Sequence, residues 1–219
     1  MPEQLPFDLE TVSRYTRGDF FEAPCNAAAL QQVAQYPPSW PSHVLIVCGP
    51  PGAGKTHLAA IWQQESSAVV VQGALPAPEE GLRAVVVDDA PRFTVDEAQA
   101  RSFLHLYNHL KETGGHMLLT AETPPRDWGI ALPDLKSRLL SVPVVTVSPP
   151  DDAVLSVVLA KMFSDRQLAV PADVIAFLVK RMERSFAAAR SLVARIDTKA
   201  LAEKRAVTVP FVRDLLDAG

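Results

Sequence analysis

Five short runs of apolar, mostly β-branched residues recur along the first two thirds of the chain, and segments with a helical pattern separate them. The runs lie at 43–48, 68–72, 84–89, 116–121 and 142–148. They are nearly continuous in apolar character, which is typical of parallel strands buried on both faces of a sheet. A helix is predicted to begin near Asn26, a residue type that caps helix N-termini well. The fold class that we predict is α/β.

The pattern changes after residue 148, where the strand-like runs end. Four helical stretches follow, and they are predicted at about 151–165, 171–182, 185–205 and 208–217. Pro149 and Pro150 mark the joint between the two parts. We therefore expect an α/β domain over 13–148 and a helical domain over 149–219, preceded by a short peptide at 1–12.

Composition limits the class of protein but does not define it. The 219 residues are 48% hydrophobic and 21% charged, as in an ordinary globular chain. No apolar run approaches the roughly 18–20 residues that a membrane-spanning helix needs. Acidic residues near the start, such as Glu3 and Asp8, are unlike a secretory signal, so we expect a cytoplasmic protein. A net charge of -4 argues against a protein that mainly coats nucleic acid.

The strongest chemical signal is GPPGAGKT, which directly follows the first predicted strand and precedes a predicted helix. This is the context that a phosphate-binding P-loop requires, whereas a glycine-rich turn matching by chance would not need it. Backbone N–H groups would surround the phosphates, Lys55 would reach their β and γ oxygens, and the Thr56 hydroxyl would bind Mg²⁺. The candidate nucleotide-binding residues here are Gly49, Pro50, Pro51, Gly52, Ala53, Gly54, Lys55, Thr56 and His57.

Two acids end the third predicted strand, in the run VVVDDA. A carboxylate at the carboxyl end of a buried strand beside the P-loop is well placed to hold Mg²⁺, so we assign Asp88 to the metal. Asp89 is a candidate for orienting the attacking water. The alternative is an acidic pair that simply faces solvent at a strand end.

The fourth predicted strand ends with Thr120 and Glu122. Both would lie between the P-loop and the two acids if this strand lies between the first and third strands of the sheet, an order typical of one large P-loop class. Glu122 is therefore a third candidate catalytic acid. A polar strand end without a function is the alternative.

These features in this order resemble the AAA+ ATPases, and in detail their DnaA/Hda branch. DFFEAPCNAAAL is similar to the aromatic-rich N-terminal signature of that branch, LPDLKSRLLS to its box VII, and KRMERSFAAARSLVARID to its lid helix. VTVPFVRDLL resembles the C-terminal end of the Hda proteins. The resemblance implies an AAA+ five-stranded parallel sheet flanked by helices, followed by a small all-α lid domain.

The resemblance also implies roles for single residues. Asn26 would lie near the adenine of a bound ADP or ATP, with Mg²⁺ at the phosphates. Arg138, in box VII, would reach the nucleotide of a neighbouring subunit and act in trans on its γ-phosphate, where such a cation speeds phosphoryl transfer by ~10³–10⁵. An arginine on a surface loop is the alternative.

One position departs from the family pattern. The family has a lid-helix arginine that contacts phosphate, and an ungapped match puts Ala187 there, with Arg184 one turn earlier and Arg190 one turn later. Because Ala187 has no cation and Asp89 is a short acid, we expect the chain alone to hydrolyse ATP slowly. The match leaves open which lid arginine, if either, contacts phosphate.

Near the N-terminus, QLPFDL resembles a short family motif that docks in an apolar pocket of the DNA polymerase sliding clamp. Pro6 would limit the entropy lost when the segment is ordered. Gln4 would bond at a polar rim, and the apolar anchors would be Leu5, Phe7 and Leu9. The alternative is an N-terminal arm that packs on its own domain.

The resemblance therefore implies a regulator that binds nucleotide and the sliding clamp and stimulates ATP hydrolysis by DnaA, so that replication does not re-initiate. No membrane partner and no dedicated DNA-binding domain are expected. The alternative is an oligomeric AAA+ ATPase, such as a helicase loader or a DnaA-like initiation factor. A small-molecule kinase fits less well, because the helical part follows the sheet and has an alanine-rich face. The sequence leaves open whether ADP or ATP is resident and whether the chain forms a homodimer.

Overall fold

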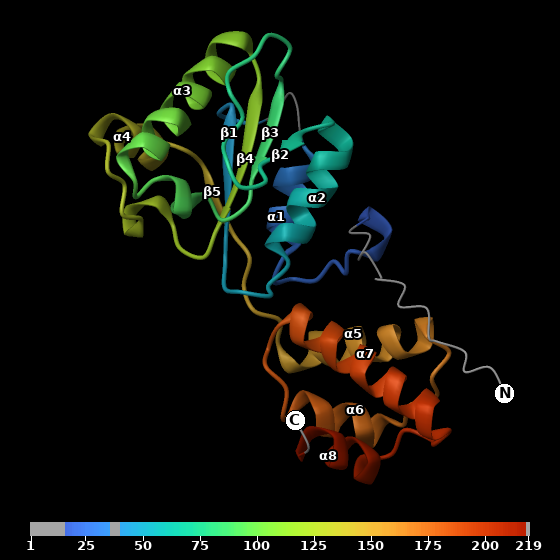
Figure 1. Ribbon diagram of the computed structural model, residues 1–219. Helices are drawn as coiled ribbons and strands as arrows, with labels where there is room; N and C mark the ends of the chain where they lie inside the picture. Colours follow the sequence, from blue (N-terminus) through green and yellow to red (C-terminus); the bar gives the residue numbers. More distant parts are fainter. Residues whose placement is uncertain (1–15, 36–39, 218–219) are drawn as a thin grey trace, which may run out of the picture.

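The computed structural model describes residues 16–35 and 40–217, which form an α/β part and an all-helical part (Figure 1). The strands of the first part are β1 (Val44–Cys48), β2 (Val69–Val70), β3 (Ala84–Val87), β4 (His116–Ala121) and β5 (Val144–Thr146). Its helices are α1 (Ala27–Ala34), α2 (Lys55–Ser66), α3 (Glu97–Thr113) and α4 (Pro133–Leu140). Three short 3-10 turns are η1 (Arg17–Asp19), η2 (Ala90–Phe93) and η3 (Pro125–Asp127).

The five strands form one parallel sheet in the order β2-β3-β4-β1-β5. The prediction of an α/β fold with a parallel sheet is therefore confirmed, and so is the position of the fourth strand between the first and the third. In this register Val47 of β1 lies beside Thr120 of β4. Because all strands are parallel, the segments after β1, β3 and β4 meet at one edge of the sheet.

The sheet has helices on both faces (Figure 1). Side chains alternate along β1, so Val44 and Ile46 pack with residues of α3 and α4, while Leu45 and Val47 pack with residues of α1 and α2. Each face thus has its own apolar core, and β1, β3 and β4 contribute to both. This arrangement fixes the central strands and the segments that follow them.

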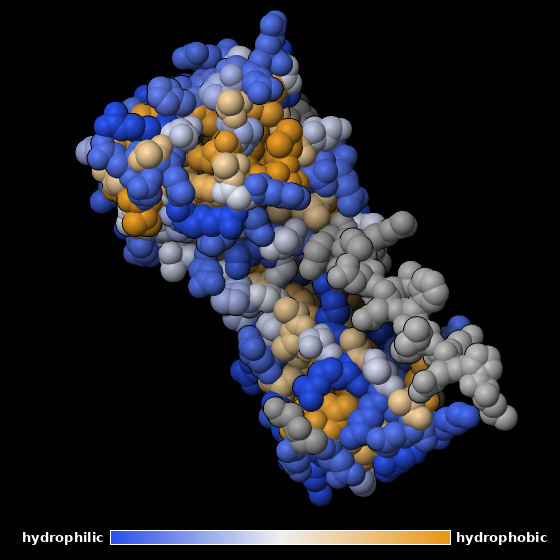
Figure 2. All heavy atoms as spheres, viewed as in Figure 1, coloured by the Kyte–Doolittle hydropathy of each residue, from blue (hydrophilic) through white to orange (hydrophobic). Residues whose placement is uncertain are grey.

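The two outer strands are less buried than the sequence predicts. Val69 and Val70 of β2 are 45% and 39% exposed, and Val144 of β5 is 41% exposed. The prediction of burial on both faces is wrong for these edge strands, because the helices cover mainly the centre of the sheet. In the space-filling view, apolar surface gathers over the sheet (Figure 2).

The C-terminal part consists of helices around an apolar core of their own. They are α5 (Asp152–Asp165), α6 (Ala172–Val179), α7 (Phe186–Glu203) and α8 (Val209–Asp217), close to the predicted ranges, although α6 ends before the predicted residue 182. The side chains of Asp151 and Ser185 accept hydrogen bonds from the first turns of α5 and α7, and each cap stabilises its helix by about 1 kcal/mol. Among the described residues, no helix is long and apolar enough to cross a membrane. We call this part, residues 149–217, the lid.

Candidate functional site

The GPPGAGKT segment connects the end of β1 to the start of α2. Gly52 and Gly54 have φ angles of 70° and 106°, a left-handed conformation that a residue with a side chain adopts at a cost. A Cβ atom at Gly49 would lie 2.3 Å from the carbonyl oxygen of Val147, just after β5. The glycines therefore allow the loop to curl tightly between the sheet and α2. The N-terminus of α2, with its partial positive charge, lies at the end of this loop.

Lys55 is the first residue of α2, and its side chain folds back along the loop. Its Nζ atom donates hydrogen bonds to the carbonyl oxygens of Gly49 at 2.7 Å and Pro50 at 2.9 Å. The ammonium group is thus held at the loop, next to the backbone N–H groups of the first turn of the helix. Cation and helix N-terminus together favour an anionic ligand.

The side chains assigned to Mg²⁺ lie beside this loop. The Thr56 hydroxyl donates to Asp88 at 3.2 Å, and the buried Thr120 hydroxyl donates to the other carboxylate oxygen of Asp88. The backbone N–H of Asp89 donates to the Thr120 hydroxyl at 3.0 Å, and Asp89 has a φ angle of 54°. Thr120 therefore fixes the orientation of Asp88 and the backbone of Asp89 at once. Its position at the end of β4 is the reason that it reaches both.

The other two predicted catalytic residues, Glu122 and Arg138, are not among the residues that line the pocket beside the P-loop. Glu122 is exposed, one residue beyond the end of β4. Arg138 lies on α4, not on a loop, and is about one third exposed. Its Nε atom donates to Asp134 at 3.2 Å, and its guanidinium carbon is 5.7 Å from the ring centre of Tyr107. These two contacts hold Arg138 on the helix surface, outside the residues that line the pocket beside the P-loop.

That pocket lies between the α/β part and the lid and has a volume of about 240 Å³. Its lining has two chemically different parts. Gly52, Gly54, Lys55 and Thr56, which we call the cationic end, supply backbone N–H groups and a cation. The rest of the lining, which we call the apolar end, consists mostly of apolar side chains and meets the cationic end where Phe186 bonds to Gly52. The remaining lining residues come from four segments and are Phe20, Phe21, Asn26, His57, Val158, Met162, Phe186, Ala187 and Arg190.

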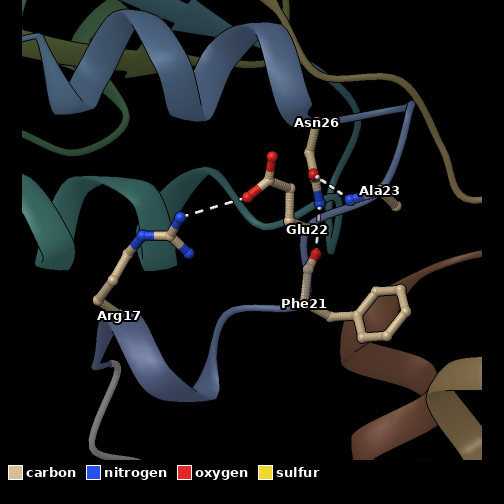
Figure 3. A network of polar contacts seen from close by, with 5 residues as sticks. All are labelled: Arg17, Phe21, Glu22, Ala23 and Asn26. Atoms are coloured by element: carbon tan, nitrogen blue, oxygen red, sulfur yellow. Dashed lines mark hydrogen bonds and ion pairs between the residues drawn. The ribbon is translucent and has the colours of Figure 1, made fainter.

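Asn26 lines the pocket and immediately precedes α1, but its amide does not cap that helix. Its Oδ1 atom accepts a hydrogen bond from the N–H of Ala23 at 2.8 Å, and its Nδ2 atom donates to the carbonyl of Phe21 at 2.9 Å (Figure 3). The expectation that Asn26 caps α1 through its side chain is wrong, because these backward bonds use the amide. Asn26 is 2% exposed, and its two bonds hold the loop before α1 in shape.

The anchors of the predicted clamp-binding peptide, Gln4, Leu5, Phe7 and Leu9, lie outside the described residues.

Comparison with known proteins adds a family match for the lid. Residues 152–216, nearly the whole lid, match the family model described as the Hda lid domain. This part of the chain is therefore similar to the lid domain of the Hda proteins.

Solved structures match the Hda-type lid and the α/β part together. Domain III of DnaA from Thermotoga maritima superposes with a TM-score of 0.78 at 19% identity, over 94% of this chain and 97% of that one. AMPPCP-bound DnaA from Aquifex aeolicus gives 0.69 at 16% identity, over 85% and 66%. The Thermotoga maritima RuvB branch migration motor gives 0.61 at 20% identity, over 80% and 61%. At these identities the structures share the AAA+ fold with this chain.

The Hda-type lid contributes residues that the sequence pattern did not single out. Val158 and Met162 of α5 and Phe186 of α7 line the apolar end of the pocket. In the sequence they are ordinary apolar positions of amphipathic helices, and only the packing of the lid on the P-loop brings them to the site. The same packing distinguishes the two lid arginines. Arg190 lines the pocket together with Ala187, whereas Arg184 is 65% exposed and pairs with Asp152 at 3.0 Å.

Proposed function

We propose that the chain is an Hda-like regulator of replication initiation. In this proposal it binds an adenine nucleotide with Mg²⁺, docks on the DNA polymerase sliding clamp and stimulates ATP hydrolysis by DnaA. The observation that carries the proposal is the Hda lid match over residues 152–216, attached to an α/β part with a P-loop.

The pocket residues fit a nucleotide. A phosphate group at the cationic end would accept hydrogen bonds from Lys55, which now donates to loop carbonyls, and from the N-terminus of α2. An adenine ring suits the apolar end beside Phe21 and Met162. A similar fold, DnaA from Aquifex aeolicus, was solved with AMPPCP, a nucleotide triphosphate analogue, which supports this class of ligand.

Thr56 and Asp88 fit Mg²⁺ as it is bound in nucleotide sites. No group of three or more His, Cys, Asp or Glu side chains suited to a metal lies within residues 16–35 and 40–217. Mg²⁺ at such sites typically uses only one or two protein oxygens, together with phosphate oxygens and water. When bound, Mg²⁺ would neutralise charge between the phosphates. Thr56 and Asp88 would hold it, and Thr120 would keep Asp88 turned toward it.

The geometry supports slow hydrolysis by the chain alone. The Asp89 carboxylate is on a short side chain and on a backbone that the hydrogen bond to Thr120 holds in a left-handed conformation. Glu122 is exposed beyond β4, and Ala187 supplies no charge to the pocket. We therefore propose that nucleotide is mainly a structural and regulatory ligand, and that Arg138 acts on the nucleotide of DnaA.

The experiment that tests this function is steady-state ATP turnover by DnaA, with and without this protein and the sliding clamp. Wild-type protein should stimulate hydrolysis, and Arg138→Ala should abolish stimulation while leaving ADP affinity unchanged. Arg101→Ala is the matched control, because Arg101 also pairs with an acid one turn earlier on an exposed helix face. Full stimulation by Arg138→Ala would exclude Arg138 as the trans-acting residue.

The clamp-binding part of the proposal rests on residues 1–12 and has its own test. A peptide of these residues should bind the clamp directly and compete with the whole protein. Replacing Gln4 and Leu5 by Ala should abolish clamp binding with little change in melting temperature. An N-terminal arm that packs on its own domain would give the opposite result, a clear loss of stability and no effect on the clamp.

The second candidate is an oligomeric AAA+ ATPase, such as a helicase loader or a DnaA-like initiation factor. The likeness of the fold to DnaA and to the RuvB motor favours it. Such an enzyme would turn over ATP without DnaA, so a rate of ~1–100 s⁻¹, typical of kinases, for the isolated chain would favour this candidate over the regulator.

A further inference from the structure

The segment before α1 joins the two parts of the molecule. We call residues 20–26 the N-terminal turn. Phe20, 8% exposed, packs in the core on the α1 and α2 face of the sheet, and its ring meets His57 edge-on at 5.0 Å. The next residue, Phe21, packs instead against the core of the lid, and so does Cys25. Two adjacent aromatic residues are thus anchored in two separate cores.

Asn26 fixes the shape of this turn. As described above, its amide bonds to the backbone of Ala23 and of Phe21, and Figure 3 shows these two bonds with the Phe21 side chain directed at the lid helices. An asparagine immediately before a helix commonly bonds to the first helical turn. Both side-chain hydrogen bonds of Asn26 instead go backward, to the segment that contains Phe21. Asn26 therefore holds the backbone from which the Phe21 side chain extends.

The turn is also tied to the joint between the two parts. The N–H of Ser148, at the start of the connection into the lid, donates to the carbonyl of Cys25 at 3.0 Å. Four residues before the turn, the carbonyl of Thr16 lies 2.8 Å from Nε2 of His57, two residues after Lys55 on α2. The N-terminal turn thus contacts α2, the joint and the lid core within a few residues.

A second contact connects the lid to the P-loop itself. The N–H of Phe186, the first residue of α7, donates to the carbonyl of Gly52 at 3.0 Å. A Cβ atom at Gly52 would lie only 2.7 Å from Cβ of Ser185, so α7 begins directly against the loop. Two of the contacts between the parts, those at Phe21 and at Gly52, involve residues that line the pocket.

We infer that the N-terminal turn couples nucleotide binding to the position of the lid, with Phe21 and Asn26 as positioning residues. A nucleotide in the pocket would contact the turn and the start of α7 together. Its binding would therefore favour the arrangement in which Phe21 packs in the lid core and Phe186 bonds to Gly52. This inference rests on the nucleotide binding proposed above and adds that lid docking depends on the turn.

The test is amide hydrogen exchange in the full chain, with and without saturating ADP and Mg²⁺. In the wild type, ADP should slow exchange in the first turn of α7 by about tenfold, since exchange there reports opening of the lid from the P-loop. In Phe21→Ala, with saturation verified by calorimetry, the slowing should fall below about twofold. Phe21→Leu, which keeps an apolar side chain in the lid core, should restore most of it.

Phe177→Ala is the matched control. Phe177 packs against the same lid core and is also partly buried, but it lies on α6 and is not among the residues lining the pocket. This variant should lose stability as Phe21→Ala does and keep the slowing by ADP. Asn26→Asp keeps an acceptor for Ala23 but loses the donor to Phe21, so it should behave as Phe21→Ala does.

Equal slowing by ADP in wild type and Phe21→Ala would overturn the coupling while leaving nucleotide binding intact. Loss of the slowing in Phe177→Ala would also overturn it, because any damage to the lid core would then suffice. A wild type that binds no adenine nucleotide in calorimetry would overturn the coupling and the proposed function together.

Discussion

The two ends of the pocket are built in different ways. The cationic end comes from one continuous segment, Gly49–Thr56, whose conformation is set by its own glycines and by the strand and helix that it joins. The apolar end is assembled from the N-terminal turn, α5 and α7, which are far apart in the sequence. The conformation of the first end is thus set locally, whereas the second end is complete only when the lid is docked. The following predictions test this difference.

The largest effect is expected at the cationic end. Lys55→Ala removes a cation that would make two hydrogen bonds to phosphate, each worth about 1.5–3 kcal/mol, so ADP affinity should fall by at least about a hundredfold. Calorimetry measures this, with Lys161→Ala, an exposed lysine of the lid, as the control. Equal affinities of wild type and Lys55→Ala would show that the P-loop is not the binding site.

Thr120 tests whether the acids beside this end need support from the sheet. Thr120→Val removes the donor to Asp88 and the acceptor for Asp89, so Mg²⁺ affinity in the presence of ADP should fall by about tenfold. The control is Thr94→Val. Thr94 is also fully buried, and its hydroxyl donates to a local backbone carbonyl, that of Pro91. Both variants should lose about 1–2 kcal/mol of unfolding free energy. If Thr94→Val weakens Mg²⁺ binding as much as Thr120→Val does, the loss of affinity follows from lower overall stability and not from the contacts of Thr120.

Arg190 tests how far the lid contributes charge. Arg190→Ala should lower ADP affinity by about five- to tenfold, because Arg190 lines the pocket and helical side chains lean toward the helix N-terminus, here toward Gly52. Arg184→Ala should change the affinity little, since its exposed pair with Asp152 lies elsewhere. Adenosine, which has no phosphate, should bind wild type and Arg190→Ala alike. The reverse ranking of the two variants would assign the phosphate contact to Arg184.

The smallest effect is expected at the opposite edge of the sheet, where His43 and His116 lie at the amino ends of β1 and β4. Burial lowers the pKa of both histidines below the ordinary value of 6.5. Between its lowered pKa and 6.5 each group binds more protons unfolded than folded, so stability is full above about pH 7 and falls as the pH drops through 6.5. The melting temperature should be about 2 °C lower at about pH 5.5 than at about pH 7.5.

His43→Asn should reduce that difference and leave ADP affinity unchanged, because His43 packs against Tyr107 with a ring distance of 4.5 Å, away from the residues lining the pocket. A melting temperature independent of pH would contradict the prediction. A change in ADP affinity in His43→Asn would instead show that the site of His43 and the nucleotide pocket are energetically coupled.

The sequence predicts the central strands and the P-loop because their signals are local. Continuous apolar runs define β1 and β4, and the glycine spacing defines the loop between β1 and α2. The exposure of Val69, Val70 and Val144 is not predictable from such runs, because a strand at the edge and one at the centre have the same composition. The hydrogen-bond partners of Asn26 are not predictable from the sequence either. Its residue type fits a helix cap, but the path of the N-terminal turn decides which groups its amide bonds to.

The lid side of the pocket could not be predicted for a related reason. The spacing of Arg184, Ala187 and Arg190 on one helix leaves both arginines within reach of a ligand. Only the direction in which α7 meets Gly52 separates them, and that direction follows from tertiary packing.

The neighbouring aromatics of the N-terminal turn have a consequence for how the chain tolerates changes in length. Phe20 has extended backbone angles, with φ -79° and ψ 120°, and successive side chains of an extended backbone point in opposite directions. Inserting or deleting one residue just before Phe20 would reverse the directions of the two phenylalanine side chains if the segments on either side stayed in place. Each core would then face a polar or misplaced side chain. Single-residue insertions here should therefore be far more damaging than conservative substitutions at either phenylalanine.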